Sequence, residues 1–207
     1  TNARVVACVL ATNTAYCGSG GAYQGTLSNC VFRFNAARVY GGGAYQSTLQ
    51  NCELRTNYSA SVGGGACYSA VQNSILQGNR AAGGGGSFYG SLRNCLVVSN
   101  TTTSRGGGAQ WSTSENCTFV NNRANSEGGG VFEGTHLNSI IYYNSAPSGS
   151  NALNAVCTNC CTIPMPSGTG NLTAAPGIAS LTDPQLLAGA AAIDAGSNQT
   201  WMAWAAY

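Results

Sequence analysis

The sequence has little charge and no lysine, which limits the partners it can bind. Charged residues make up 7% of the 207 residues, against about 25% in a typical soluble domain. All eight basic residues are arginines, and the formal net charge is +2. Nucleic-acid binding needs a dense basic surface, so we expect no nucleic-acid partner. Low charge also gives little electrostatic protection against self-association.

Long apolar runs are missing as well. No stretch of about 18 apolar residues occurs, so the sequence predicts no membrane-spanning helix. The chain begins with Thr1-Asn2-Ala3-Arg4 and shows no signal-peptide pattern, so if the protein is secreted this sequence is a mature or trimmed form. Its ten cysteines favour an oxidising compartment. We therefore expect an extracellular or cell-surface location.

What the sequence has in abundance is repetition. Asparagine followed by Cys or Ser recurs at steps of 22, 22, 21, 22 and 22 residues, at Asn29, Asn51, Asn73, Asn94, Asn116 and Asn138. Glycine triplets recur in phase, at residues 41–43, 63–65, 84–86, 106–108 and 128–130. A fixed period with fixed small and polar positions indicates a solenoid in which each repeat forms one coil.

Apolar and polar residues alternate within each repeat, which favours strands over helices. Cys52 and Leu54 alternate with Glu53 and Arg55, a period of two. Glycine in every repeat would cost a helix about 1 kcal/mol per residue. We therefore expect an all-β, single-stranded parallel β-helix with three short strands per coil and about 4.8 Å between coils. The predicted core column contains Leu10, Phe32, Leu54, Leu76, Val97, Phe119 and Ile141.

The repeat also predicts the organisation of the chain. Residues 1–145 should form the β-helix, with six to seven coils of about 22 residues. Residues 146–207 should form an irregular C-terminal tail that contains a last partial coil and a capping or docking segment.

A second asparagine column follows the first at a constant distance: Asn13, Asn35, Asn57, Asn79, Asn100, Asn122 and Asn144. A buried asparagine at a turn can pair its amide with the backbone and with the asparagines above and below it. We interpret this column as a structural ladder. N-glycosylation is the alternative, because Asn57-Tyr58-Ser59 and Asn100-Thr101-Thr102 match the acceptor pattern.

Six cysteines share another column: Cys8, Cys30, Cys52, Cys95, Cys117 and Cys160. Coils about 4.8 Å apart place neighbouring Cα atoms within the roughly 4.4–6.8 Å range of disulfides. Cys95 with Cys117 is the best candidate pair, and a ladder of buried free thiols is the alternative. Metal binding is a third interpretation, disfavoured because no histidine accompanies the cysteines and C-x-x-C occurs once, at 157–160. We expect no metal and no cofactor.

No clear active site is visible. Polysaccharide lyases and hydrolases need clustered ionisable side chains on one face. The acids here are few and scattered: Glu53, Glu115, Glu127, Glu133, Asp183 and Asp194. The single histidine, His136, stands at an otherwise apolar column position, which favours a packing role over that of a general base. We expect a protein that is not an enzyme.

Two adjacent columns are rich in aromatic residues, and at least one must point outward because consecutive strand residues face opposite sides. The candidate surface comprises Tyr23, Tyr45, Tyr68, Tyr89 and Trp111, with Trp201, Trp204 and Tyr207 in the tail. Such a surface can stack on sugar rings or pack against another chain. No capping helix precedes Val5, so the tail is expected to cap its own rod or to dock on the first coil of another copy.

The unit G-G-G-A-Y-x-x-x-L-x-N-C-x-L-x-x-N, seen at residues 41–57, resembles the right-handed parallel β-helix repeats of the pectate-lyase-like superfamily. It is most similar to choice-of-anchor Q proteins of bacteria, and more loosely to polymorphic outer-membrane protein repeats. The order of tail segments supports this resemblance: residues 140–145, 160–162, 164–166, 170–173, 183–184 and 192–196. The resemblance implies a right-handed fold and a surface location, without a defined reaction.

These observations lead to three hypotheses. The leading one is a non-catalytic, secreted structural protein that assembles with copies of itself, head to tail, into an extracellular fibre or surface layer. The first alternative is an adhesin that binds polysaccharide through the aromatic stripe. The second alternative is a polysaccharide-cleaving β-helix enzyme.

Overall fold

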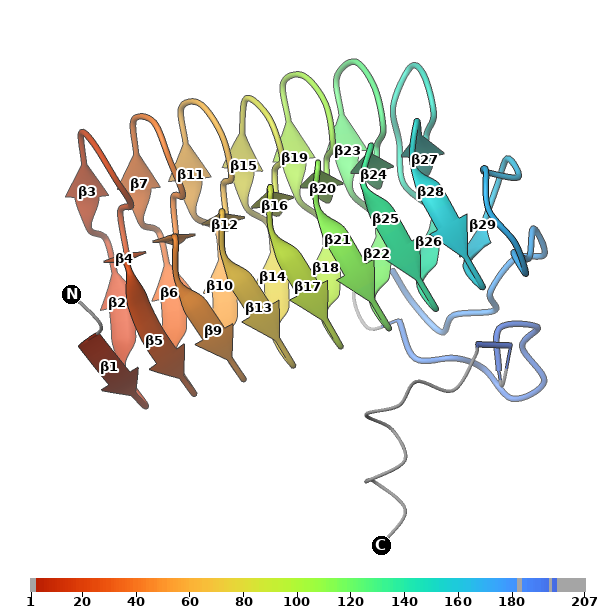
Figure 1. Ribbon diagram of the computed structural model, residues 1–207, viewed down its shortest axis with the longest axis horizontal. Coiled ribbons are helices and arrows are strands. Elements are labelled where there is room, and N and C mark those ends of the chain that lie inside the picture. The colour runs from red at the N-terminus through yellow and green to blue at the C-terminus, as the bar shows by residue number, and fades with distance from the viewer. Residues whose placement is uncertain (1–2, 182–183, 194, 197–207) are drawn as a thin grey trace, which may run out of the picture.

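Successive coils stack into a rod whose strands form four parallel sheets (Figure 1). The structure is a computed structural model that describes residues 3–181, 184–193 and 195–196. We label the four sheets A to D, with the strands of each given below. Within each coil the chain passes through sheets D, A, B and C in turn, and each strand pairs with its equivalent in the next coil. The all-β parallel β-helix predicted from the repeat is confirmed.

Sheets A and B each contain eight strands. Sheet A consists of β1 (Ala3–Val6), β5 (Gly25–Ser28), β9 (Thr48–Gln50), β13 (Ala70–Gln72), β17 (Ser91–Arg93), β21 (Thr113–Glu115), β25 (Thr135–Leu137) and β28 (Val156–Thr158). Sheet B consists of β2 (Val9–Ala11), β6 (Val31–Arg33), β10 (Glu53–Arg55), β14 (Ile75–Gln77), β18 (Leu96–Val98), β22 (Thr118–Val120), β26 (Ile140–Tyr142) and β29 (Cys161–Thr162).

Sheets C and D are built from two-residue strands. Sheet C consists of β3 (Thr14–Ala15), β7 (Ala36–Ala37), β11 (Tyr58–Ser59), β15 (Arg80–Ala81), β19 (Thr101–Thr102) and β23 (Arg123–Ala124). Sheet D consists of β4 (Ala22–Tyr23), β8 (Ala44–Tyr45), β12 (Ala66–Cys67), β16 (Ser87–Phe88), β20 (Ala109–Gln110), β24 (Val131–Phe132) and β27 (Ala152–Leu153).

The expectation of three strands per coil is wrong, because a complete coil has four. The residues directly after each glycine triplet form the additional strand, which belongs to sheet D. The Ala44 amide donates to the Gly65 carbonyl at 2.9 Å, and Ala44 pairs with Ala66 in register. A Cβ on Gly42 would lie 2.5 Å from the Gly64 and Tyr58 carbonyl oxygens, so the triplet allows the close backbone approach that precedes this strand.

The 22-residue period sets the register of the sheets. Leu54 pairs with Phe32 on one side and with Leu76 on the other. The predicted core column is buried, and six of its seven side chains, from Phe32 to Ile141, are fully buried. Each of the six Asn-Cys or Asn-Ser corners carries an asparagine with φ between 48° and 54°, a left-handed conformation that asparagine tolerates better than most residues.

Two coil-to-coil steps are a residue shorter than the others, and the connection after sheet C absorbs the difference in both. In the later step, Arg123 bridges to Ser145 at a separation of 22, whereas Val131 pairs with Ala152 at a separation of 21. In the earlier step, Tyr58 pairs with Arg80 at a separation of 22, whereas Ala66 pairs with Ser87 at a separation of 21. In between, the amides of Ala82 and Gly83 both donate to the Ser61 carbonyl, at 2.9 Å each. The Asn, Cys and core columns therefore stay aligned through the irregularity.

The stack continues past residue 145. Strands β27, β28 and β29 extend sheets D, A and B, which provides the last partial coil expected in the tail. Single bridges join Val156 to Ser167 and Cys161 to Leu172, so the following segment lies along this coil. The described part of the chain contains no helix with the length and apolar character needed to cross a membrane.

Candidate functional site

The second asparagine column forms the predicted ladder through the rod. Asn57 donates from Nδ2 to Asn79 Oδ1 at 3.0 Å, and Asn79 donates in the same way to Asn100 at 3.0 Å. Each Oδ1 also accepts the backbone N–H of the asparagine in the coil before it. Equivalent amide bonds join all seven predicted members, Asn13, Asn35, Asn57, Asn79, Asn100, Asn122 and Asn144. These amides are committed to the scaffold.

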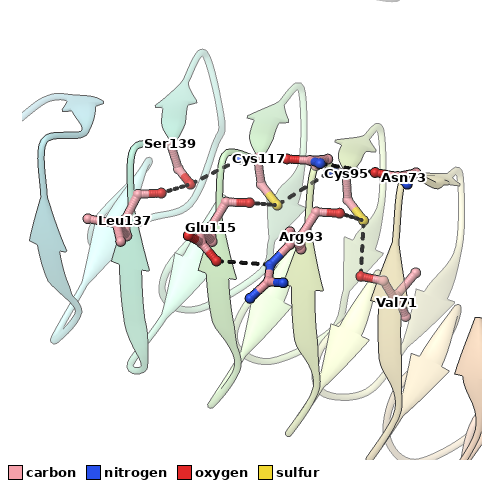
Figure 2. Close-up of polar contacts among 9 residues, drawn as sticks. Val71, Asn73, Arg93, Cys95, Glu115, Cys117, Leu137 and Ser139 are labelled. Carbon is pink, nitrogen blue, oxygen red and sulfur yellow. Dashed lines mark hydrogen bonds and ion pairs between the residues drawn. The ribbon is translucent and has the colours of Figure 1, made fainter. Parts of the chain in front are cut away.

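The cysteine column is a ladder of free thiols, the alternative to disulfide pairing. All ten cysteines, which lie among the described residues, are unpaired with one another. The Cys95 amide donates to Cys117 Sγ at 3.4 Å, and the Cys117 amide donates to Ser139 Oγ at 3.2 Å. Figure 2 shows these three side chains in a row along the rod. Serine can replace cysteine because either side chain accepts this bond.

Stacking geometry explains why the disulfide prediction fails. Coils in register keep the Cα–Cβ bonds of a column parallel, so Cβ atoms are separated by about the same 4.8 Å as the coils. A disulfide needs Cβ atoms roughly 3.5–4.5 Å apart. The Cα criterion alone therefore overstates the chance of a bond between Cys95 and Cys117. Burial raises the pKa of the Cys117 thiol well above its usual value, and the Cys67 thiol to a pKa of about 12.

His136 lies in the core, as its column position predicts, and it is fully buried. Its Nδ1 lies 2.7 Å from Ser114 Oγ, and its Nε2 lies 3.3 Å from the Glu133 carbonyl oxygen. The Phe119 ring packs edge-on against the imidazole at 5.8 Å. Desolvation lowers the His136 pKa to about 4. With both nitrogens engaged inside the rod, the imidazole has no route to a substrate.

Each of the four acids in the described residues has an ion-pair or hydrogen-bond partner. Glu53 pairs with Arg55 at 2.8 Å, Glu115 with Arg93 at 2.9 Å, and Glu127 with Arg105 at 2.6 Å. Glu133 accepts a hydrogen bond from Trp111 Nε1 at 2.5 Å. The remaining acids, Asp183 and Asp194, lie outside the described residues.

The predicted aromatic surface exists as a continuous ridge of Tyr23, Tyr45, Tyr68, Tyr89 and Trp111. Tyr23 and Tyr45 end strands β4 and β8 of sheet D, whereas the other three lie at the corner between sheets D and A. Tyr23 stacks on Tyr45 with centroids 5.3 Å apart, and Tyr68 stacks on Tyr89 at 5.3 Å. Trp111 continues the row 5.2 Å from Tyr89. The ring faces therefore pack mainly against each other. The ridge presents ring edges and phenol hydroxyls to a partner. The predicted tail residues Trp201, Trp204 and Tyr207 lie outside the described residues.

A groove of about 270 Å³ lies on the outer face of sheet A, beside this ridge. Tyr89 and Trp111 each stand two residues before a strand of the sheet, β17 and β21. The outward residues that line the groove carry hydroxyl, amide, guanidinium and carboxylate groups: Gln72, Ser91, Arg93, Thr113, Glu115 and Thr135. Figure 2 shows Arg93 and Glu115 from neighbouring strands pointing toward each other.

Sequence reasoning missed this groove, although the repeat contains its signal. Five hydroxyl residues, Thr26, Thr48, Ser91, Thr113 and Thr135, occupy one outward column of sheet A, interrupted by Ala70 and flanked by Arg4 and Val156. The next outward column holds Gln50, Gln72, Arg93 and Glu115. Two polar columns on one flat sheet indicate a hydrogen-bonding face. A search directed at clustered acids overlooks it.

The coil architecture defines the class of the protein: it is a right-handed parallel β-helix of the pectate-lyase-like superfamily. A family model described as "Periplasmic copper-binding protein (NosD)" matches residues 24–160, about two thirds of the chain. The chain therefore belongs to the NosD family. A comparison with curated proteins finds no significant match.

Proposed function

We propose that this chain is a glycan-binding β-helix of the cell envelope or surface that binds polysaccharide along sheet A without cleaving it. The family is described as periplasmic, which supports a location in the envelope or outside the cell. The observation that carries the proposal is the polar groove on sheet A, bordered by the aromatic ridge. The first alternative from the sequence, an adhesin, thus has a specific surface in its favour.

The geometry favours hydrogen bonding to sugar hydroxyls along the rod. The hydroxyls of Ser91, Thr113 and Thr135 are exposed and follow one another from coil to coil. Hydroxyl side chains both donate and accept, which matches the hydroxyls of a sugar chain. Because the ridge tyrosines stack mainly on each other, sugar binding there relies on ring edges and phenol groups. This differs from the ring-face stacking that the sequence suggested.

Copper, which the family description names, does not fit the described residues. Copper binds through thiolate, thioether and imidazole groups. The described residues contain no group of three or more His, Cys, Asp or Glu side chains placed to hold a metal ion. Both nitrogens of His136 are engaged, and the Cys95 thiol points to the carbonyl oxygens of Val71 and Arg93.

Binding without cleavage is part of the proposal. Glycoside hydrolysis uses two carboxyl groups that flank one bond, one of them with a raised pKa. Glu115 and Glu133, the acids nearest to the groove and the ridge, are held by Arg93 and Trp111. Incubation with the bound oligosaccharide should therefore release no new reducing ends, and release of such ends would refute this part.

The binding proposal predicts that Tyr89→Ala and Gln72→Ala each weaken binding of a neutral linear oligosaccharide by roughly tenfold, the effect of losing one or two hydrogen bonds. An array of linear oligosaccharides identifies the probe, and calorimetry on the full chain measures the dissociation constant. Tyr143→Ala is the matched control, since Tyr143 is a corner tyrosine with φ of 56° against 48° for Tyr89. Absence of binding across the array, or equal affinity of Tyr89→Ala, would refute the proposal.

End-to-end assembly is a second candidate function, favoured by the low charge of the chain, which gives little electrostatic protection against self-association. Apolar side chains are also exposed on the first described coil, where Val6 and Val9 are 46% and 60% exposed. Electron microscopy of the full-length protein over a range of concentrations should then show rods that lengthen with concentration. Monomeric particles throughout would exclude this candidate.

A further inference from the structure

A second hollow, of about 330 Å³, lies on sheet C near the first coils, away from the groove on sheet A. Its floor consists of small side chains, including Ala15, Ala36 and Ala37. Tyr16, directly after β3, and Tyr58, in β11, line it from different coils, and they are 67% and 46% exposed. The volume falls near the lower end of the roughly 300–1,000 Å³ usual for small-molecule sites. One sugar ring is a ligand of suitable size.

The tyrosines of this cleft differ from those of the ridge. Each ridge tyrosine stacks on a neighbour, whereas neither Tyr16 nor Tyr58 has a ring partner among the described residues. Arg38 covers one face of Tyr16, with its guanidinium carbon 4.5 Å from the ring centroid. This cation–π contact holds the guanidinium at the edge of the cleft. The Tyr58 ring remains available to an apolar ligand face.

The charge around the cleft is positive. Arg38 lines it, and Arg80 stands one coil from Tyr58 in the same outward column of sheet C. Within the described residues, the arginines paired with carboxylates are Arg55, Arg93 and Arg105, all elsewhere on the rod. A guanidinium without a carboxylate partner, beside an apolar floor, suits a ligand with one flat apolar face and one carboxylate.

We propose that this cleft binds a uronate residue of an acidic glycan. The apolar face of the sugar ring packs on the alanine floor beside Tyr58, and its carboxylate pairs with Arg38. The inference depends on the proposed function only in taking a glycan as the ligand class. Sheet B and sheet D separate sheet C from sheet A within each coil, so the two surfaces can be tested independently.

The test compares binding of trigalacturonate and of neutral maltotriose to the full chain by calorimetry. Trigalacturonate should bind more tightly than maltotriose. Arg38→Gln should weaken trigalacturonate binding by roughly tenfold, the expected effect of losing one charge-assisted hydrogen bond. Tyr58→Ala should weaken it by a similar factor, because the ring wall is lost. Arg123→Gln is the matched control: Arg123 lies in the same outward column two coils beyond Arg80, and its loss should change the affinity less than twofold.

Three outcomes would overturn the inference: equal affinity for the two trisaccharides, unchanged affinity in Arg38→Gln, or an equal loss in Arg123→Gln. Circular dichroism and the thermal midpoint of each variant show whether the coil is intact. Neutral oligosaccharide binding that depends on Tyr89 reports on sheet A separately. If the sheet C test fails, the proposed function at sheet A is unaffected. If the sheet A test fails, trigalacturonate binding that depends on Arg38 still supports the site on sheet C.

Discussion

Asn100→Ala is expected to destabilise the rod by about 4 kcal/mol, because it leaves two or more buried polar groups without partners. Asn100 Oδ1 accepts the Asn79 backbone N–H at 2.9 Å and the Asn79 amide at 3.0 Å. Its Nδ2 donates to the Leu76 carbonyl at 2.8 Å. Alanine satisfies none of these groups. Urea unfolding of the full chain measures the change in free energy.

The matched control for this prediction is Asn125→Ala. Asn125 is exposed in the loop after β23, and it bonds through its backbone amide to the Thr102 carbonyl. Its replacement should change stability by less than about 0.5 kcal/mol, as is usual for surface sites. Amide hydrogen exchange should show the Asn100 defect around Asn79 and in the neighbouring coils, since coils contact mainly their neighbours. Equal stability of the two variants would contradict the prediction that the asparagine ladder stabilises the rod.

Acid is expected to destabilise the protein through His136. The folded-state pKa of about 4 lies below the value of about 6.5 for an unfolded chain. As pH falls below about 6.5, the unfolded chain binds a proton that the folded protein does not, so stability decreases until the pH reaches the folded pKa. The decrease is about 1.4 kcal/mol per pH unit, or about 3 kcal/mol in total. Above pH 7 this contribution is complete and constant.

Urea unfolding at pH 7, 6, 5 and 4.5 tests this prediction against His136→Gln, whose amide keeps a polar partner for Ser114 and does not titrate. The difference in free energy between the two proteins should shrink as pH falls, because the pH-dependent loss is confined to the histidine. The groups packed around the ring, Ser114, Phe119 and the Glu133 carbonyl, carry no charge that would compensate. Parallel pH profiles for the two proteins would exclude His136 as the source.

The repeat alignment predicts most of the scaffold because a solenoid converts sequence distance directly into contact. The 21-residue step from Asn79 to Asn100 and the 22-residue step from Asn100 to Asn122 both end in amide bonds. The core column can be predicted from the repeat for the same reason. Sheet D was not predicted because its two-residue strands are too short to show an alternating pattern beside the glycines.

The surfaces were harder to predict than the scaffold, for physical reasons that differ from site to site. The thiol ladder depends on Cβ separation, which column spacing alone does not give. The groove on sheet A depends on hydroxyl and amide columns, which the search for acids passed over. The cleft on sheet C joins Tyr16 and Tyr58, which belong to different columns and to coils two repeats apart. No single column therefore contains that site.

The two shorter coil-to-coil steps have a consequence for how such rods evolve. The connection after sheet C absorbs a missing residue at Ser61 and Gly83 while the asparagine ladder on either side keeps its bonds. Insertions and deletions at that corner leave the hydrogen-bonded frame intact, whereas the same change inside a strand of sheet A would move every later side chain to the opposite face. Length variation among relatives should therefore concentrate at this corner, which makes it a suitable position for an inserted tag or an added loop.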